Sequence, residues 1–292
     1  MAKKKANKKK AEDKAPKKKK KRTTKKKVVR KKTPKKKKTT KKKAPKKRTR
    51  RKKKTLGIVI ANKDHAAPLT HQLASIKEQS VKPDEIIIID DGSEHDNSKQ
   101  VIQDFYDQSK NDYNIKIELN EKNKGVVATV NRGCDISESD YLYFASADDT
   151  LLTDFVKCHK EAIINHQPAI TCSDESLPNE GFGQGVEALG GYYIPGHCSC
   201  IKKEPLLEFG KFIEEFGFKC DWFLLHAIGL KYGWYSIKQN LSIKKSDSGG
   251  YANTTVSEGK LPAIQQAMID HVSSNPLFDD IRDEMLHLIN KE

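Results

Sequence analysis

The stretch Glu85-Ile-Ile-Ile-Ile-Asp90-Asp91-Gly92-Ser93 indicates the fold of this chain. Four consecutive isoleucines are typical of a strand buried on both faces, inside a parallel sheet covered by helices. The strand then ends in two carboxylates, a glycine and a serine. Ligands of open α/β sheets bind just beyond the carboxyl ends of the strands, where two acids can accept hydrogen bonds from a base or a ribose. Asp-Gly is also a common turn pair, so this stretch alone leaves a plain turn open.

Short apolar segments alternate with amphipathic segments on both sides of this stretch. The expected strands are residues 56–61, 85–90, 115–119 and 141–145. The expected helices are residues 68–79, 97–109, 126–136 and 153–164. This alternation predicts an α/β fold with a mostly parallel sheet and helices on both of its faces.

A second expected strand also ends in paired acids. Residues 141–145 lead into Ser146-Ala147-Asp148-Asp149. Two acidic strand ends at one edge of a sheet are harder to explain as turns than a single one. Because hard cations take carboxylate oxygens, the two together could hold a divalent cation and the sugar and phosphates of a nucleotide.

The charge of the chain is divided between two unlike segments. Residues 1–54 contain 34 lysines and arginines and two acids, a net charge of +32, whereas the other 238 residues carry −15. The first segment is almost free of large apolar residues, so we expect a disordered Lys-rich arm. Such an arm binds polyanions by releasing counterions, which makes nucleic acid or an anionic membrane surface its expected partner.

The composition also bears on the location of the protein. No apolar run approaches the roughly 18 residues that a membrane span requires, and no apolar signal core follows the N-terminus. Six cysteines in so long a chain do not suggest a disulfide framework. We therefore expect a cytoplasmic protein without a transmembrane segment, with peripheral attachment to a membrane surface as an option.

Several short motifs follow one another in residues 56–165. They are Asn62-Lys63-Asp64, residues 75–80, residues 83–85 leading into residues 90–93, Asn123-Lys124-Gly125, Asn131-Arg132-Gly133, and residues 140–144 leading into residues 146–149. Each motif alone is weak evidence for a family, but all of them in this order are strong evidence. With them, residues 56–165 resemble the nucleotide-binding half of an inverting glycosyltransferase of the GT-A (Rossmann-like) fold, in the large family two group.

The resemblance implies a nucleotide-sugar donor and Mn²⁺ or Mg²⁺ as cofactor. It implies that Asp91, with Asp90, contacts the base and ribose and that Asp148, with Asp149, ligates the metal on the diphosphate. The other nucleotide-binding positions that it implies are Ala61, Asn62, Asp64, Asn131, Ser146 and Ala147.

Two of these positions depart from the family pattern. Ala61-Asn62-Lys63-Asp64 stands where Pro-x-Tyr-Asn is frequent, which removes the aromatic ring that would stack on the base. Ser146 replaces the first acid of the usual Asp-x-Asp, so the metal must rely more on Asp148 and Asp149.

The second half of the chain is less informative. A helix is expected over residues 221–232, and Asp221 at its start is either a helix cap or, by the resemblance, the catalytic base. Residues 181–185 are expected to form a flexible loop, and His197-Cys198-Ser199-Cys200 fits alternation in a strand better than a zinc site. Further strands are expected at residues 169–172, 233–237 and 241–245, and two amphipathic helices at residues 257–290.

These observations predict a three-part organisation. It consists of the arm (residues 1–54), a GT-A domain (55–253, with a nucleotide-binding half 55–165 and an acceptor half 166–253) and C-terminal helices (254–292). The predicted function is a metal-dependent inverting transfer of a sugar from a nucleotide sugar to an acceptor hydroxyl on an unknown glycan, lipid or protein. The alternative is a catalytically inactive, transferase-like protein that binds polyanions through its arm.

Overall fold

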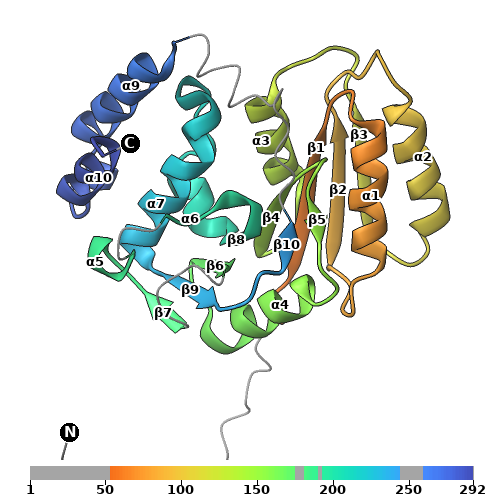
Figure 1. Ribbon diagram of the computed structural model, residues 1–292, viewed down its shortest axis with the longest axis horizontal. Helices are drawn as coiled ribbons and strands as arrows, with labels where there is room; N and C mark the ends of the chain where they lie inside the picture. The colour runs from red at the N-terminus through yellow and green to blue at the C-terminus, as the bar shows by residue number, and fades with distance from the viewer. Residues whose placement is uncertain (1–52, 175–180, 190–192, 244–258, 292) are drawn as a thin grey trace, which may run out of the picture. The chain divides into compact units, whose positions relative to one another are not determined.

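The computed structural model describes residues 53–174, 181–189, 193–243 and 259–291, which belong to one compact unit. Their main feature is an eight-stranded sheet in the order β3-β2-β1-β4-β8-β6-β9-β7, shown in Figure 1. The arm lies outside the described residues except for its last two lysines. Lys54 donates a 2.8 Å hydrogen bond to Asp140, so this residue, predicted to end the arm, is anchored to the domain.

The first four strands form the parallel part of the sheet. They are β1 (Leu56–Asn62), β2 (Glu85–Asp90), β3 (Ile115–Leu119) and β4 (Tyr141–Ser146). Strand β1 pairs in parallel with β2 on one side and with β4 on the other. The predicted strands are confirmed.

The isoleucines of β2 explain why helices cover both faces. Successive strand residues point to opposite faces. Ile86 and Ile88 enter one core with residues of α1 (Ala66–Lys77) and α2 (Ser98–Ser109), whereas Ile87 and Ile89 enter a second core with Val127 of α3 (Val126–Ile136). All four isoleucines are fully buried, and Figure 1 shows α1 and α2 alongside β1, β2 and β3.

A glycine sets the distance between α3 and the sheet. A Cβ atom added to Gly133 would lie 2.2 Å from Cγ1 of Val59 on β1. The helix therefore approaches the strand more closely than any side chain at this position would allow.

The rest of the sheet is mixed. Strand β8 (Ser199–Lys202) runs antiparallel to both β4 and β6 (Ile170–Ser173), and β9 (Trp234–Ile237) runs parallel to β6. A separate two-stranded pair joins β5 (Thr150–Leu151) to β10 (Ser242–Ile243). The strand expected at residues 241–245 is confirmed at Ser242 and Ile243, begins one residue later than expected, and lies outside the described residues at Lys244 and Lys245.

The flexible loop predicted at residues 181–185 is wrong in part. Gly181–Gly183 forms β7, an edge strand antiparallel to β9. A Cβ atom on Gly183 would lie 2.6 Å from the Trp234 ring, so the missing side chain lets the two strands pack closely. Only the long-range pairing with β9 makes this glycine-rich segment a strand.

The remaining helices follow the first half of the sheet along the chain. They are α4 (Phe155–His166), α5 (Val186–Leu189), α6 (Lys203–Glu208), α7 (Cys220–Tyr232), α9 (Leu261–Ser274) and α10 (Arg282–Ile289), with 3₁₀ turns η1 (Gly196–Cys198), η2 (Glu214–Lys219) and η3 (Pro276–Phe278). Residues 222–230 of α7 are all buried, as expected for a helix covered on every side.

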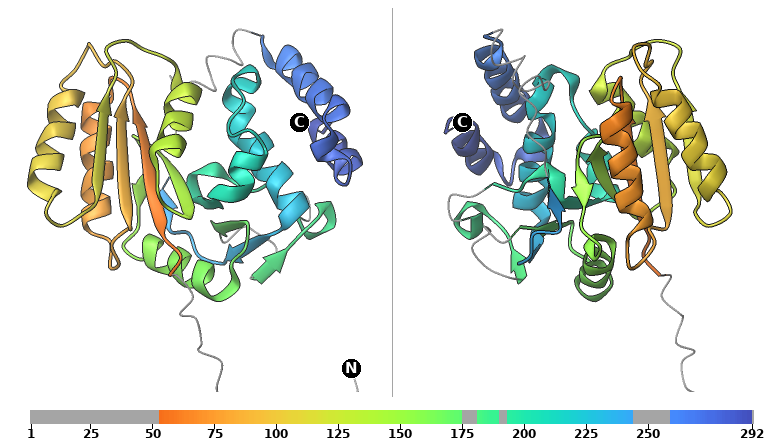
Figure 2. Two further views of the ribbon diagram at one scale, coloured as in Figure 1. Left: turned by 180° about the vertical axis from the view of Figure 1, so that it is seen from behind. Right: turned by 45° about the vertical axis from the view of Figure 1, so that its right-hand side comes forward.

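The C-terminal helices α9 and α10 help to bury α7. Met268 of α9 and Met285 of α10 belong to the same apolar core as α7, and Figures 1 and 2 show the pair α9 and α10 beside it. The predicted boundary between residues 253 and 254 lies outside the described residues and stays a prediction. None of the helices in the described ranges is long and apolar enough to cross a bilayer.

Candidate active site

The strand order places a ligand edge at the carboxyl ends of β1 and β4. The chain proceeds from β1 outward to β2 and β3, then returns to β4 on the other side of β1. Open α/β sheets bind ligands where the strand order reverses in this way. Ala61 pairs with Ser146 and Asn62 pairs with Asp90, so the predicted motifs meet at this edge.

Asp90 is a structural residue of this edge. It is fully buried, and its carboxylate accepts hydrogen bonds from Ser93 N (2.8 Å), Ser93 Oγ (2.5 Å) and Asn62 Nδ2 (2.9 Å). The prediction that Asp90 contacts a nucleotide is therefore corrected. Its carboxylate shapes the turn after β2 and has no surface to offer a ligand, and the same holds for the buried Asn62 amide that bonds to it.

Asp91 is also largely occupied by donors from the protein. Its Oδ1 accepts from Asn120 Nδ2 (3.1 Å) and Lys124 N (2.8 Å), and its Oδ2 accepts from Gly125 N (2.9 Å). A carboxylate has about four acceptor positions, so little capacity is left for a base or ribose. Asp91 thereby holds the turn that leads into α3.

Gly92 makes this arrangement possible. It adopts φ +73°, and a Cβ atom would lie 2.6 Å from the carbonyl carbon of Lys122. The loops after β2 and β3 touch backbone to backbone at this point. This is the reason for a glycine directly after the two acids.

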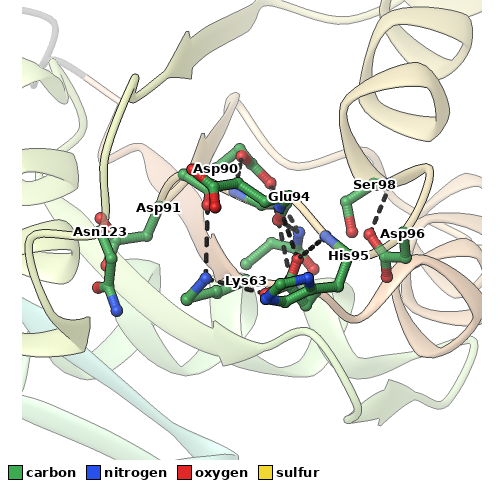
Figure 3. Close-up of polar contacts among 12 residues, drawn as sticks. Lys63, Asp90, Asp91, Glu94, His95, Asp96, Ser98 and Asn123 are labelled. Atoms are coloured by element: carbon green, nitrogen blue, oxygen red, sulfur yellow. Dashed lines mark hydrogen bonds and ion pairs between the residues drawn. The ribbon is translucent and has the colours of Figure 1, made fainter.

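Asp64 joins the loop after β1 to the loop after β2. Its Oδ1 accepts from the backbone N–H groups of Glu94 (2.8 Å) and His95 (2.9 Å), and its Oδ2 accepts from Lys63 Nζ (2.9 Å). Figure 3 shows Lys63, Glu94 and His95 lying close together in this part of the site. The Lys63 hydrogen bond, followed by that from His95, holds the pKa of Asp64 well below its ordinary value. Asp64 also has φ +51°, a backbone conformation that Asp tolerates better than most residues.

The loop after β4 contains a carboxylate of a different kind. Ser146 is exposed, Ala147 and Asp149 are buried, and Asp148 is half-buried. Ser146 N donates to Asp149 Oδ2 at 3.4 Å, so the Asp149 carboxylate stabilises the loop in which it lies. In the described part of the chain, Asp148 makes no hydrogen bond or ion pair, which leaves both of its oxygens for a ligand.

These residues fit a divalent cation that is shared with a substrate. The described residues contain no group of three or more His, Cys, Asp or Glu side chains that could hold a metal on their own. Mg²⁺ is usually bound by one or two carboxylates together with substrate phosphates. Asp148 suits that arrangement, in which phosphate oxygens would complete the coordination.

Asp221 lies at the second position of α7. The N-cap is Lys219, without a side-chain cap bond, so the alternative role of Asp221 as the helix cap is wrong. Its Oδ1 accepts from Trp222 N at 2.7 Å, and its Oδ2 lies against Gly196 of η1, where a Cβ atom would be 2.5 Å away. The positive end of the helix dipole favours the ionised carboxylate there.

The turn η1 connects Asp221 to the parallel half of the sheet. The hydroxyl of Tyr143 on β4 donates to the His197 carbonyl at 2.9 Å. Burial raises the pKa of that hydroxyl well above its ordinary value, so it stays protonated and keeps donating. Asp221, the predicted base, and Asp148, the predicted metal ligand, thus stand on elements that are tied to the same strand.

Asn131 serves the fold. Its Nδ2 donates to the Phe212 carbonyl (2.8 Å), and its Oδ1 accepts from Phe212 N (3.0 Å). One hydrogen bond at each end of the amide goes to the protein, and the predicted contact of Asn131 with the nucleotide stays a prediction. The side chain links α3 to the segment that leads into η2.

Two further residues organise this edge and were missed. Asn120 directly follows β3 and bonds to Asp91, a polar side chain after a strand like those singled out on β2 and β4. Asp96 accepts from Ala66 N (2.6 Å) and Ser98 N (2.9 Å) and so caps the starts of both α1 and α2. For Asp96, only the tertiary structure reveals the pairing.

The family comparison decides the identity of the domain. Residues 56–203, just over half of the chain, match the model of the family described as Glycosyl transferase family 2. The chain belongs to glycosyl transferase family 2. The predicted fold and the predicted class of enzyme, a glycosyltransferase, are therefore confirmed.

Solved structures show the same fold at low sequence identity. Residues 1–349 of TarS from S. aureus in complex with UDP-GlcNAc are similar with a TM-score of 0.67 and 13% identity, over 81% of this chain and 71% of that chain. The mannosyltransferase PcManGT from Pyrobaculum calidifontis in complex with GDP-Man and Mn²⁺ is similar with a TM-score of 0.59 and 13% identity. The match covers 82% of this chain and 70% of that chain. No curated protein sequence matches the chain.

Proposed function

We propose that this family 2 transferase moves a sugar from a nucleotide sugar to an acceptor hydroxyl with inversion, in a metal-dependent reaction. The observation that carries the proposal is Asp148, a carboxylate without a protein partner among the described residues, at the sheet edge where the strand order reverses. The two similar structures were solved with UDP-GlcNAc and with GDP-Man and Mn²⁺, which supports a nucleotide-sugar donor here.

Asp148 would hold the cation together with the donor diphosphate. A bound divalent ion neutralises the charge that develops on the leaving diphosphate. Ser146 is exposed beside it and has a hydroxyl that can bond to the ribose or the phosphates. The half-buried Ala61, paired with Ser146, would offer only its backbone to the donor.

Asp221 would accept the proton of the acceptor hydroxyl. The hydroxyl oxygen forms a bond to the anomeric carbon while the bond from that carbon to the diphosphate oxygen breaks. A single displacement of this kind inverts the configuration at the anomeric carbon. A positioned general base contributes about 10²–10⁴-fold to such a step.

A direct test is hydrolysis and transfer with a panel of sugar nucleotides, with Mn²⁺ and with excess chelator. We expect release of nucleoside diphosphate with at least one donor and its loss on chelation. The inactive alternative predicts no release with any donor, and family membership favours the enzyme over that alternative. Release that continues unchanged in chelator would contradict metal dependence.

A further inference from the structure

His226 is a buried histidine of α7 that the proposed function leaves without a role. Its side chain is 1% exposed, and it follows the proposed base, Asp221, on the same helix. Its ring packs on the indole of Trp222, with the ring centroids 4.6 Å apart, which restrains its orientation. Because buried polar groups need hydrogen-bond partners, the partners of the two ring nitrogens define what this side chain does.

Both ring nitrogens of His226 lie next to backbone groups. Nε2 lies 3.3 Å from Ile194 N, and Nδ1 lies 2.7 Å from the carbonyl oxygen of Trp222. A backbone N–H group only donates, so Nε2 is the acceptor, and Nδ1 carries the proton that is donated to the Trp222 carbonyl. These partners assign His226 as the neutral Nδ1–H tautomer.

The two hydrogen bonds belong to a closed circuit of contacts that passes through the base. Trp222 N donates to Asp221 Oδ1 at 2.7 Å. Two residues after Ile194, a Cβ atom added to Gly196 would lie 2.5 Å from Asp221 Oδ2. One oxygen of the carboxylate is thus held by α7, and the other lies against the segment that His226 holds.

The bond to His226 lies where this segment enters the core. Tyr193 is 60% exposed, whereas Ile194 is 1% exposed. The Ile194 side chain also packs on α7, where a Cβ atom on Gly229 would be 2.7 Å from its Cδ1. Apolar packing of this kind sets the distance between the segment and the helix but is not directional. A hydrogen bond is directional, so the bond to His226 fixes the orientation of the backbone that leads to Gly196.

We propose that His226 is a positioning residue for Asp221. By accepting from Ile194 N, it holds Gly196 against the carboxylate and so sets the direction in which the base meets the acceptor hydroxyl. This inference rests on the proposed function. His226 does not touch the reacting atoms, and its effect on the rate comes through geometry, since a misplacement of about 1 Å can cost about 10²-fold.

The test compares two variants that each keep one of the two hydrogen bonds. In His226→Gln, the amide oxygen can take the place of Nε2 and accept from Ile194 N. In His226→Asn, the shorter amide can reach only the Trp222 carbonyl. The assay is the release of nucleoside diphosphate in the presence of Mn²⁺, with UDP-GlcNAc, GDP-Man and the rest of the sugar-nucleotide panel as donors and water as the acceptor.

We expect the two variants to differ in kcat and to agree in KM for the donor. His226→Gln should keep kcat within about threefold of the unaltered protein, and His226→Asn should lose about tenfold or more. Ile228→Val, at a buried position of α7 outside the circuit, is the control for altered core packing and should keep kcat. Equal kcat values in folded His226→Gln and His226→Asn would overturn the proposal, because the bond to Ile194 would then have no effect on the base.

A second measurement uses the unaltered protein and does not depend on activity. Nitrogen NMR of the protein with ¹⁵N-labelled histidine reports the tautomer of each imidazole, and the His226 signal is the one that disappears in His226→Gln. We expect Nδ1–H with an unprotonated Nε2. The Nε2–H tautomer would overturn the proposal, since Nε2 could not accept from Ile194 N. No release with any donor of the panel would instead overturn the proposed function, whichever tautomer is found.

Discussion

At the scale of single residues, the ligand edge contains acids of two kinds. Asp64, Asp90 and Asp91 are occupied by backbone and side-chain donors and build the loops. Asp148 has no such partner among the described residues. The difference between them lies in the donors that surround each carboxylate, and it separates the positions to mutate for function from those to mutate for stability.

Asp148→Ala should abolish metal-dependent donor binding without unfolding the protein. The side chain makes no hydrogen bond or ion pair in the described structure, so its loss removes a ligand and leaves no buried donor unpaired. Calorimetry with a nucleoside diphosphate, with and without Mn²⁺, measures the effect. Asp104→Ala, at an exposed position of α2, is the control. If Asp148→Ala keeps the same affinity and the same metal dependence, another residue must ligate the metal.

Asp221→Asn should fold normally, bind donor and fail to transfer. The amide oxygen of Asn can still accept from Trp222 N, but Asn cannot take the acceptor's proton. We expect turnover to fall by about 10²-fold or more. Steady-state transfer assays beside donor-binding calorimetry measure both properties. Near-normal transfer would point to another acid, and Glu214→Gln and Glu215→Gln, both at exposed positions of η2, are the variants to compare.

At the scale of elements, the contact between α3 and β1 depends on Gly133. Gly133→Ala should destabilise the protein by about 1–3 kcal/mol, the usual range for overpacking, because the new methyl group would overlap Val59. Denaturant unfolding measures the loss. In a double-mutant cycle, Val59→Ala should recover part of it, since the two positions are in direct contact. Additive losses would show that the helix moves away from the strand instead.

The link between α4 and β6 should make the stability depend on pH. His159 is fully buried, its Nδ1 lies 2.7 Å from Thr171 Oγ1, and burial lowers its pKa to about 3. The unfolded chain binds this proton near pH 6.5 and the folded chain does not, so stability is lost as the pH falls below about 6.5.

The expected slope from this histidine approaches about 1.4 kcal/mol per pH unit between pH 6 and pH 4. Chemical denaturation over that range should show a shallower slope for His159→Gln than for the unaltered protein. His71→Gln, at an exposed position of α1, should leave the slope unchanged. Identical slopes in all three proteins would exclude His159 as the source.

At the scale of the whole molecule, the arm and the domain have opposite charge. We propose that the arm binds polyanions, and Lys54 shows where a truncation should stop because it is anchored to Asp140. Removal of residues 1–52 should leave the turnover of small substrates nearly unchanged. Binding of the full chain to DNA or anionic liposomes should weaken by about 10³-fold or more between 50 and 200 mM salt if six or more contacts form. Equally tight binding by the truncated protein in low salt would exclude the arm as the contact.

The sequence alone determined the parallel half of the sheet and its helices. An apolar, β-branched run such as Ile86-Ile87-Ile88-Ile89 is typical of a strand buried on both faces, and amphipathic spacing indicates the helices that cover it. These signals are local. The same local signals, read with the order of the motifs, led to the family and to Asp148 and Asp221 as candidate metal-binding and catalytic residues.

The tertiary structure alone decided which polar residues face inward. The donors to Asp91 come from residues 29 to 34 positions further along the chain, and the partner of Asn131 lies 81 positions away. Strand β7 likewise exists only through its pairing with β9. A carboxylate has the same local sequence signal whether it binds a ligand or a neighbouring loop, because its partner is set by the packing of distant segments.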